Sequence, residues 1–325
     1  MSSSGKKSWI KRPIVSLWPF FVPMVFWPAV FVLSCFATWF AIAIYPSRND
    51  VTPHFITASI VSFLISVRCV HNHRWLWRLC RSVWHFQTES TRRVVLHFDP
   101  TLKERWDFDV LFKRFEAALD DLALWFDISF RRRLVVYLFP SYSSIQQAFQ
   151  QKIGGTALKQ PNAIVITADS NLEEIMRHEI THLYSFHWNR KAPPLLSEGL
   201  AVWLQGTNFG MPIDFAARLV SQHSLSFDQL LKPNFFFSPQ YQNACYCLAG
   251  SFTGFLIRRY GWNKYRQCYR SAGIGYLRRK FKKTFGLSLK EAESKWQTAL
   301  MTDDLPPMKV LRKRLERDLA MSFAC

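Results

Sequence analysis

The stretch from Arg177 to Gly206, RHEITHLYSFHWNRKAPPLLSEGLAVWLQG, constrains this chain more than any other. It begins with HEITH, which fits the pattern H-E-x-x-H. On a helix, His178 and His182 lie one turn apart on the same face. Two imidazoles at that spacing can share one zinc ion, and Glu179 beside them can hold a water molecule. Glu198, in SEGLA, is the candidate third ligand, which leaves one coordination position open.

Two helices separated by a proline turn are predicted around this motif. Ser170 and Glu173 form an S-x-x-E capping box, so the first helix should begin near Asn171. The second is predicted from about Ser197 to Gln205, after the prolines of the turn. This arrangement can bring Glu198 back over the two histidines.

Each of these side chains also has an ordinary structural explanation. Composition alone produces H-E-x-x-H in about one chain in a hundred of this length. A histidine can be a core or surface residue with one hydrogen bond, and Glu198 can be a carboxylate favoured by a helix N-terminus. The place of Glu198 in a short helix after a proline turn favours the metal site.

The same stretch resembles a known family. HEITH followed by PPLLSEGLAVWLQG is similar to the gluzincin metallopeptidases of the peptidase MA-like group, whose pattern is HExxH, a linker and an (S/N)EGLA helix. Downstream, AGSFTGFLIRRYG and FKKTFGLSLKEAESKW resemble the closing helices of that group, so the similarity covers roughly residues 93–300. One departure is Leu195-Leu196, where the group usually has an aromatic residue; it affects packing more than chemistry.

The resemblance implies an α+β fold with a zincin-like peptidase domain at 93–300: a small mixed sheet, an HExxH active-site helix and a helical C-terminal part. It implies one zinc ion per chain, held by His178, His182 and Glu198. Glu179 would be the general base that activates water for hydrolysis of a peptide or protein substrate.

Two tyrosines are candidates for the residue that stabilises the oxyanion. Tyr246 or Tyr241 could donate this hydrogen bond, a role that some gluzincins give to Tyr or His, and a packed tyrosine is an equal alternative. Two other functions also stay open: a catalytically inactive zincin-like scaffold or binding protein at a membrane, and a zinc hydrolase that acts on something other than peptides.

An apolar N-terminal region predicts a membrane anchor at residues 1–70. Two spans are expected, at about 28–45 and 51–67, although the second is short enough to be an interfacial or packed helix. Basic residues precede the first span and follow the second, so a hairpin keeps both flanks on the cytoplasmic side. We therefore expect an integral protein of the inner (cytoplasmic) membrane with its peptidase domain facing the cytoplasm.

The chain is strongly basic, with a formal net charge of +19, which calls for an anionic partner. Residues 71–92 alternate tryptophan with arginine. Because this stretch directly follows an apolar run, it predicts a juxtamembrane linker that lies on anionic lipids. Nucleic acid is the less favoured partner. The seven cysteines show no disulfide framework and no C-x-x-C pair, which favours reduced thiols. The sequence does not indicate an oligomeric state.

Strands are predicted at 93–98, 134–139 and 163–168, with helices at 108–126 and 144–151 and a loop at Gly154-Gly155. The resemblance implies that the strand at 163–168 edges the cleft, where an extended peptide could pair. Further helices are expected at 241–260 and from Ser288 to Leu300, the latter started by a second capping box. The basic amphipathic tail, 301–325, could lie on an anionic membrane surface or dock on the domain itself, and the sequence favours neither.

Overall fold

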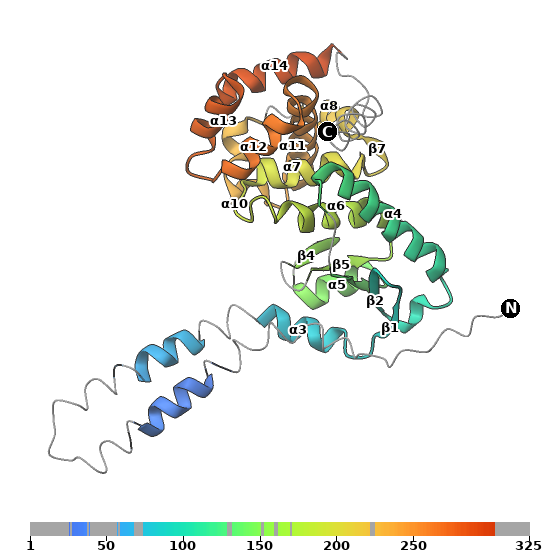
Figure 1. The fold of residues 1–325 in the computed structure, drawn as a ribbon, viewed down its shortest axis with the longest axis vertical. Helices are drawn as coiled ribbons and strands as arrows, with labels where there is room; N and C mark the ends of the chain where they lie inside the picture. The colour runs from blue at the N-terminus through green and yellow to red at the C-terminus, as the bar shows by residue number, and fades with distance from the viewer. Residues whose placement is uncertain are drawn as a thin grey trace, which may run out of the picture.

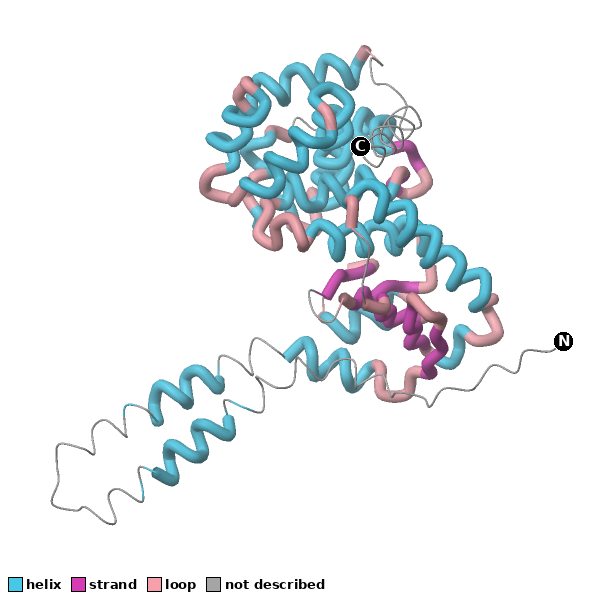
Figure 2. Tube along the Cα trace, viewed as in Figure 1, coloured by secondary structure: helices cyan, strands magenta, loops and turns pink. Residues whose placement is uncertain are grey.

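The computed structural model describes residues 26, 28–37, 39, 57, 59–67, 74–128, 132–150, 153–158, 162–169, 171–221 and 225–302. From α3 onward these residues form an α+β domain with a small mixed sheet and a helical C-terminal part (Figure 1), as the sequence predicts. Figure 2 shows the sheet gathered in one part of the domain, apart from the mostly helical remainder.

The sheet has five strands in the order β1-β2-β3-β5-β4. Its centre is parallel, since β3 pairs with both β2 and β5 in parallel, whereas β1 and β4 are antiparallel edge strands. The central strands are almost wholly apolar and buried, as expected for strands covered on both faces. The strands are β1 (Gln87–Ser90), β2 (Val94–Phe98), β3 (Leu134–Phe139), β4 (Gly155–Leu158) and β5 (Ala163–Thr167).

Helices cover the two faces of this sheet. Alternate residues of β3 point to opposite sides: Val136 and Leu138 join the larger core, which includes α4 (Phe108–Phe126). Tyr137 and Phe139 join a second cluster with α3 (Arg74–Ser82) and α5 (Tyr142–Phe149). The sheet and the helices on its two faces therefore form three layers, and one face of the sheet is turned toward the helical part.

The packed domain begins earlier than the predicted boundary at residue 93. In the segment interpreted as a juxtamembrane linker, α3 contacts α5, and β1 pairs with β2. Leu79 and Val83 are fully buried in the second core cluster. Their spacing of four residues places them on one helical face. This apolar pair is hard to recognise in the sequence because tryptophans and arginines surround it.

The helical part is organised around α11, whose middle is buried on all sides and which packs on α7 and α8. Gly199 of α7 permits this contact, because a Cβ there would lie 2.6 Å from the Ala249 carbonyl oxygen of α11. The elements are α6 (Leu172–Ser185), α7 (Pro194–Gln205), β6 (Thr207–Asn208), β7 (Met211–Pro212), α8 (Ile213–Ser221), α9 (Phe227–Leu230), α10 (Pro233–Phe236), α11 (Gln242–Tyr260), α12 (Trp262–Ser271), α13 (Leu277–Phe285) and α14 (Leu289–Met301).

Residues 28–37 and 59–67 are helical, and the rings of Phe31 and Phe63 lie 5.2 Å apart between them. Within the described ranges, no helix combines the length and apolar character needed to cross a membrane. The rest of both predicted spans and the tail from residue 303 lie outside the described residues. The membrane hairpin therefore stays a prediction.

Several element boundaries differ from those expected. The second helix of the motif, α7, begins at Pro194 rather than Ser197, because proline suits the first helical position, where no amide hydrogen is needed. Ser170 lies outside the described residues, and Asn171 occupies the N-cap of α6 without a side-chain capping bond. The predicted capping box of α14 is confirmed: Ser288 and Glu291 bond reciprocally.

The predicted edge strand at 163–168 is corrected by the sheet order. This segment is β5, which is paired on both sides. The edge next to α6 is β4, in a stretch where the sequence predicts a loop at Gly154-Gly155. Four residues with a glycine start give too weak a strand pattern to identify β4 from sequence.

Candidate metal centre

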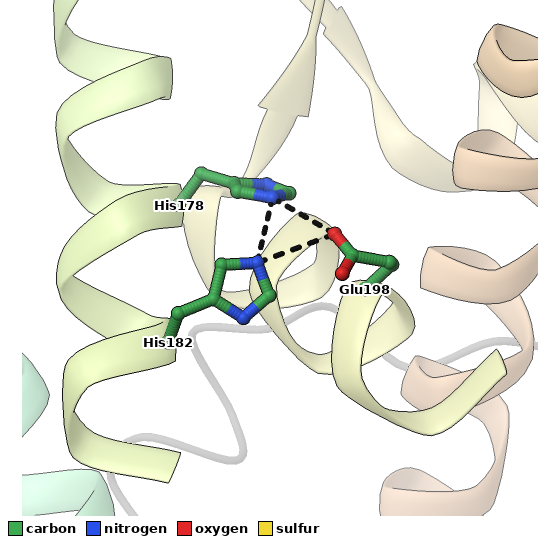
Figure 3. Close-up of side chains that lie close together, drawn as sticks. All are labelled: His178, His182 and Glu198. Carbon is green, nitrogen blue, oxygen red and sulfur yellow. Dashed lines mark hydrogen bonds and ion pairs between the residues drawn. The ribbon is translucent and has the colours of Figure 1, made fainter. Parts of the chain in front are cut away.

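The three predicted metal ligands meet where α6 crosses α7 (Figure 3). His178 Nε2 and His182 Nε2 each lie 3.2 Å from Glu198 Oε2, and the two nitrogens are 3.1 Å apart. Helix α6 places the imidazoles one turn apart, and α7 returns the carboxylate over them after the proline turn. Within the described parts of the chain, this is the one group of three such side chains that can hold a metal ion.

The size of this triangle fits a tetrahedral ion. Nitrogen and oxygen ligands about 2.0–2.1 Å from a tetrahedral zinc ion lie about 3.3 Å from one another. The three observed separations, 3.1–3.2 Å, are close to that value. The three atoms are therefore spaced as the ligands of one tetrahedral ion would be, and His178, His182 and Glu198 would hold it.

Gln205, near the end of α7, fixes the tautomer of His178, that is, which ring nitrogen carries the hydrogen. The amide nitrogen of Gln205 donates to the Thr207 carbonyl oxygen at 2.6 Å, which orients the amide. Its oxygen therefore faces His178 Nδ1 at 2.8 Å and accepts a hydrogen bond from the Nδ1–H group. In the neutral imidazole, Nε2 then carries no hydrogen, and its lone pair points toward His182 and Glu198. This is the tautomer that can bind a metal through Nε2.

Glu198 is held as a carboxylate. Burial by itself would raise its pKa, but when His182 and His178 are protonated, their charges and the hydrogen bonds that they donate outweigh burial and hold the pKa well below its usual range. A largely buried negative charge facing two imidazole nitrogens needs a cation, either a protonated histidine or a metal ion.

Glu179 lies beside the cluster and is almost fully buried. Its carboxylate accepts a hydrogen bond from the backbone amide of Ala157, on the outer side of the edge strand β4. Burial raises its pKa to about 7, and the charge of His178 opposes that rise. Gly155 makes room for this contact, because a Cβ there would lie 2.9 Å from Glu179 Oε1.

Tyr246 also lies at the cluster. Its ring centroid is 5.9 Å from that of His178, and its hydroxyl accepts a hydrogen bond from Gln242 Nε2 at 3.1 Å. Burial raises its pKa well above the ordinary value, and the negative charges of Glu198 and Glu179 add to the rise. Tyr241 instead stacks on the ring of Phe235, with centroids 4.7 Å apart.

A partly buried arginine, Arg177, holds α6 and α7 together. Arg177 donates to the Leu204 carbonyl oxygen from Nε at 3.2 Å and from Nη2 at 3.1 Å. The same Nη2 donates to Asp121 of α4 at 2.5 Å. These bonds fix the crossing of the two helices and so the position of Glu198 over the histidines.

Sequence reasoning missed Gln205, Ala157, Gly155 and Arg177. A signal existed for Gln205, which follows Glu198 by seven residues and so lies two turns further along the same face of α7. Ala157 and Gly155 could not be found in this way, because their roles depend on which strand forms the sheet edge.

No protein-family model matches this chain, and no curated protein matches it either.

Proposed function

We propose that this chain is a zinc-dependent peptidase of the gluzincin type. One observation carries the proposal: two imidazole nitrogens and a carboxylate oxygen converge within 3.2 Å of one another, and the buried carboxylate of Glu179 lies beside them on a sheet edge. A histidine pair with one carboxylate and one open position is the ligand set of catalytic zinc sites in peptidases.

Zinc is the metal that suits this donor set best. Two imidazoles and one carboxylate are intermediate in softness, and their spacing matches tetrahedral coordination. When bound, zinc supplies Lewis-acid chemistry: it polarises a carbonyl group and makes water more acidic. His178, His182 and Glu198 would hold the ion.

Glu179 is the proposed general base. Its carboxylate takes a proton from the attacking water and then passes that proton to the amine that leaves. The amide of Ala157 holds the carboxylate at the sheet edge, so the base needs little reorganisation before it acts.

The edge strand β4 is the proposed platform for an extended peptide. It pairs only with β5 in the sheet, and its other side faces the metal cluster through Ala157. An added strand would run past Glu179 and pair with the outward-facing backbone groups of β4 other than the Ala157 amide, and these hydrogen bonds would align the scissile carbonyl. Tyr246 is the proposed donor to that carbonyl oxygen as negative charge develops on it.

Membrane attachment is the second part of the proposal. Large apolar side chains in residues 28–37 and 59–67 are exposed in the chain alone, among them Leu33, Phe36, Phe63 and Leu64. Such a surface needs lipid or a protein partner to cover it. With the basic flanks on either side, anionic membrane lipids at a cytoplasmic face are the proposed partner, and the domain would then face the cytoplasm.

The proposed reaction is tested with Glu179→Gln. We expect this variant to keep its zinc and to lose hydrolysis of an unfolded protein substrate such as casein, because an amide cannot accept the proton. Hydrolysis by the variant at the wild-type rate would contradict the role of Glu179. Zinc without hydrolysis in the wild type, across peptide and protein substrates, would favour the inactive scaffold instead.

A further inference from the structure

A surface pocket lies apart from His178, His182 and Glu198. It has a volume of about 630 Å³ and is walled by α13 and by the beginning of α14, with Phe227 of α9 at one side. None of the metal-site residues lines it. Its volume is in the range of pockets that hold small molecules, about 300–1,000 Å³.

The walls of this pocket are strongly basic. Five cationic side chains face two acidic ones, Asp228 and Glu293; the cations are Arg278, Arg279, Lys282, Lys283 and Lys290. Both acids are already engaged: Asp228 pairs with Arg278 at 2.6 Å, and Glu293 accepts the Phe227 amide hydrogen at 2.9 Å. Over the described residues, the other four cations form no ion pair, so the pocket carries excess positive charge.

This charge arrangement works against the stability of α13. Arg278 and Lys282 are four residues apart, as are Arg279 and Lys283, and like charges at that spacing repel along a helix. Both arginines lie in the first turn, where the helix dipole disfavours positive charge. Repulsion of this kind is relieved when an anion binds among the side chains.

We propose that the pocket binds an anion that carries more than one phosphoryl group. Arginine matches phosphate oxygens with a planar fork, and lysine adds a compact charge. Ser288 lines the same pocket at the start of α14; its Oγ accepts the Glu291 amide hydrogen at 3.2 Å, which leaves its hydroxyl proton for a ligand. A lipid headgroup and a soluble polyphosphate both offer this chemistry.

The test uses the full chain and two probes, inorganic tripolyphosphate and phosphatidylcholine vesicles with or without cardiolipin, whose headgroup carries two phosphates. The pocket variant is Lys282→Glu/Lys283→Glu, and the matched control is Lys113→Glu/Arg114→Glu, an exposed pair on α4 with the same change of charge. We expect the pocket variant to bind at least about tenfold more weakly, which corresponds to about 1.4 kcal/mol. The control should stay within about twofold of the wild type.

The outcomes separate the source of the anion and can overturn the proposal. Binding of tripolyphosphate that is lost only in the pocket variant supports a soluble ligand. Pocket-dependent binding confined to cardiolipin vesicles supports a lipid headgroup. Equal weakening in both double variants would show that diffuse net charge, and not the pocket, attracts the anion. The proposal would also be overturned if the full chain bound neither probe. None of these results depends on the zinc site.

Discussion

Gln205 and His178 are joined by a hydrogen bond of 2.8 Å that sets which nitrogen of the histidine faces the metal cluster. The bond works only because the Gln205 amide is itself oriented by the Thr207 carbonyl oxygen. The candidate metal site therefore includes a support that lies two turns beyond Glu198 on α7.

Removal of this support should weaken metal binding. We expect Gln205→Ala to lower zinc affinity about 10- to 100-fold, because the imidazole of His178 loses the partner that fixes its tautomer and orientation. Competition with a chromophoric chelator measures the dissociation constant. Gln297→Ala, an exposed glutamine on α14, is the control. Equal affinities of Gln205→Ala and wild type would show that His178 needs no such support.

The place of Glu179 can be tested through Gly155. A Cβ at position 155 would lie 2.6 Å from Ile175 Cγ2 and 2.9 Å from Glu179 Oε1, so Gly155→Ala must displace the base. A displacement of about 1 Å can cost about 100-fold in rate, while zinc content should be unchanged. Gly275→Ala is the control, since a Cβ there meets nothing within 4 Å. Undiminished peptidase turnover in Gly155→Ala would argue against a catalytic Glu179.

The two candidate tyrosines give opposite expectations. Tyr246→Phe should lower kcat about 100- to 1,000-fold with little change in KM, because the lost donor acts mainly on the developing oxyanion. Tyr241→Phe should leave kcat near the wild-type value, because the ring of Tyr241 stacks on Phe235 instead. Steady-state kinetics of both variants decide the assignment, and a larger loss of kcat in Tyr241→Phe would reverse it.

The sheet carries a pH-dependent contribution to stability. His97 is buried on β2 and stacks on Tyr137, and burial lowers its pKa from 6.5 to about 4. The unfolded chain therefore takes up a proton first as the pH falls. The contribution is complete above about pH 6.5 and is lost toward pH 4, a change of up to about 3 kcal/mol.

Urea unfolding between about pH 4 and pH 7 measures this contribution. In His97→Gln, the free energy of unfolding should fall less steeply with acid than in the wild type. His187→Gln, an exposed histidine after α6, is the control and should retain the wild-type slope. Parallel profiles for His97→Gln and the wild type would mean that His97 is not held neutral by the fold.

Much of the site could be predicted because it is local in sequence. The positions of His178 and His182 follow from helical periodicity, and the proline turn allows Glu198 to return over them. The sheet edge could not be predicted in this way, since strand order depends on tertiary pairing and β4 is short and begins with glycine. For the same reason, Leu79 was assigned to a membrane linker, although it packs inside the domain.

The most direct test of the account is the zinc content of the purified full chain, measured by mass spectrometry for the wild type, Glu198→Ala and Glu173→Ala. Glu173 lies exposed in the first turn of α6 and serves as the control. We predict about one zinc ion per chain in the wild type and in Glu173→Ala, and little or none in Glu198→Ala, since two histidines alone bind it weakly. A wild-type chain without zinc, even after reconstitution, would contradict the metal site and the peptidase proposed from it.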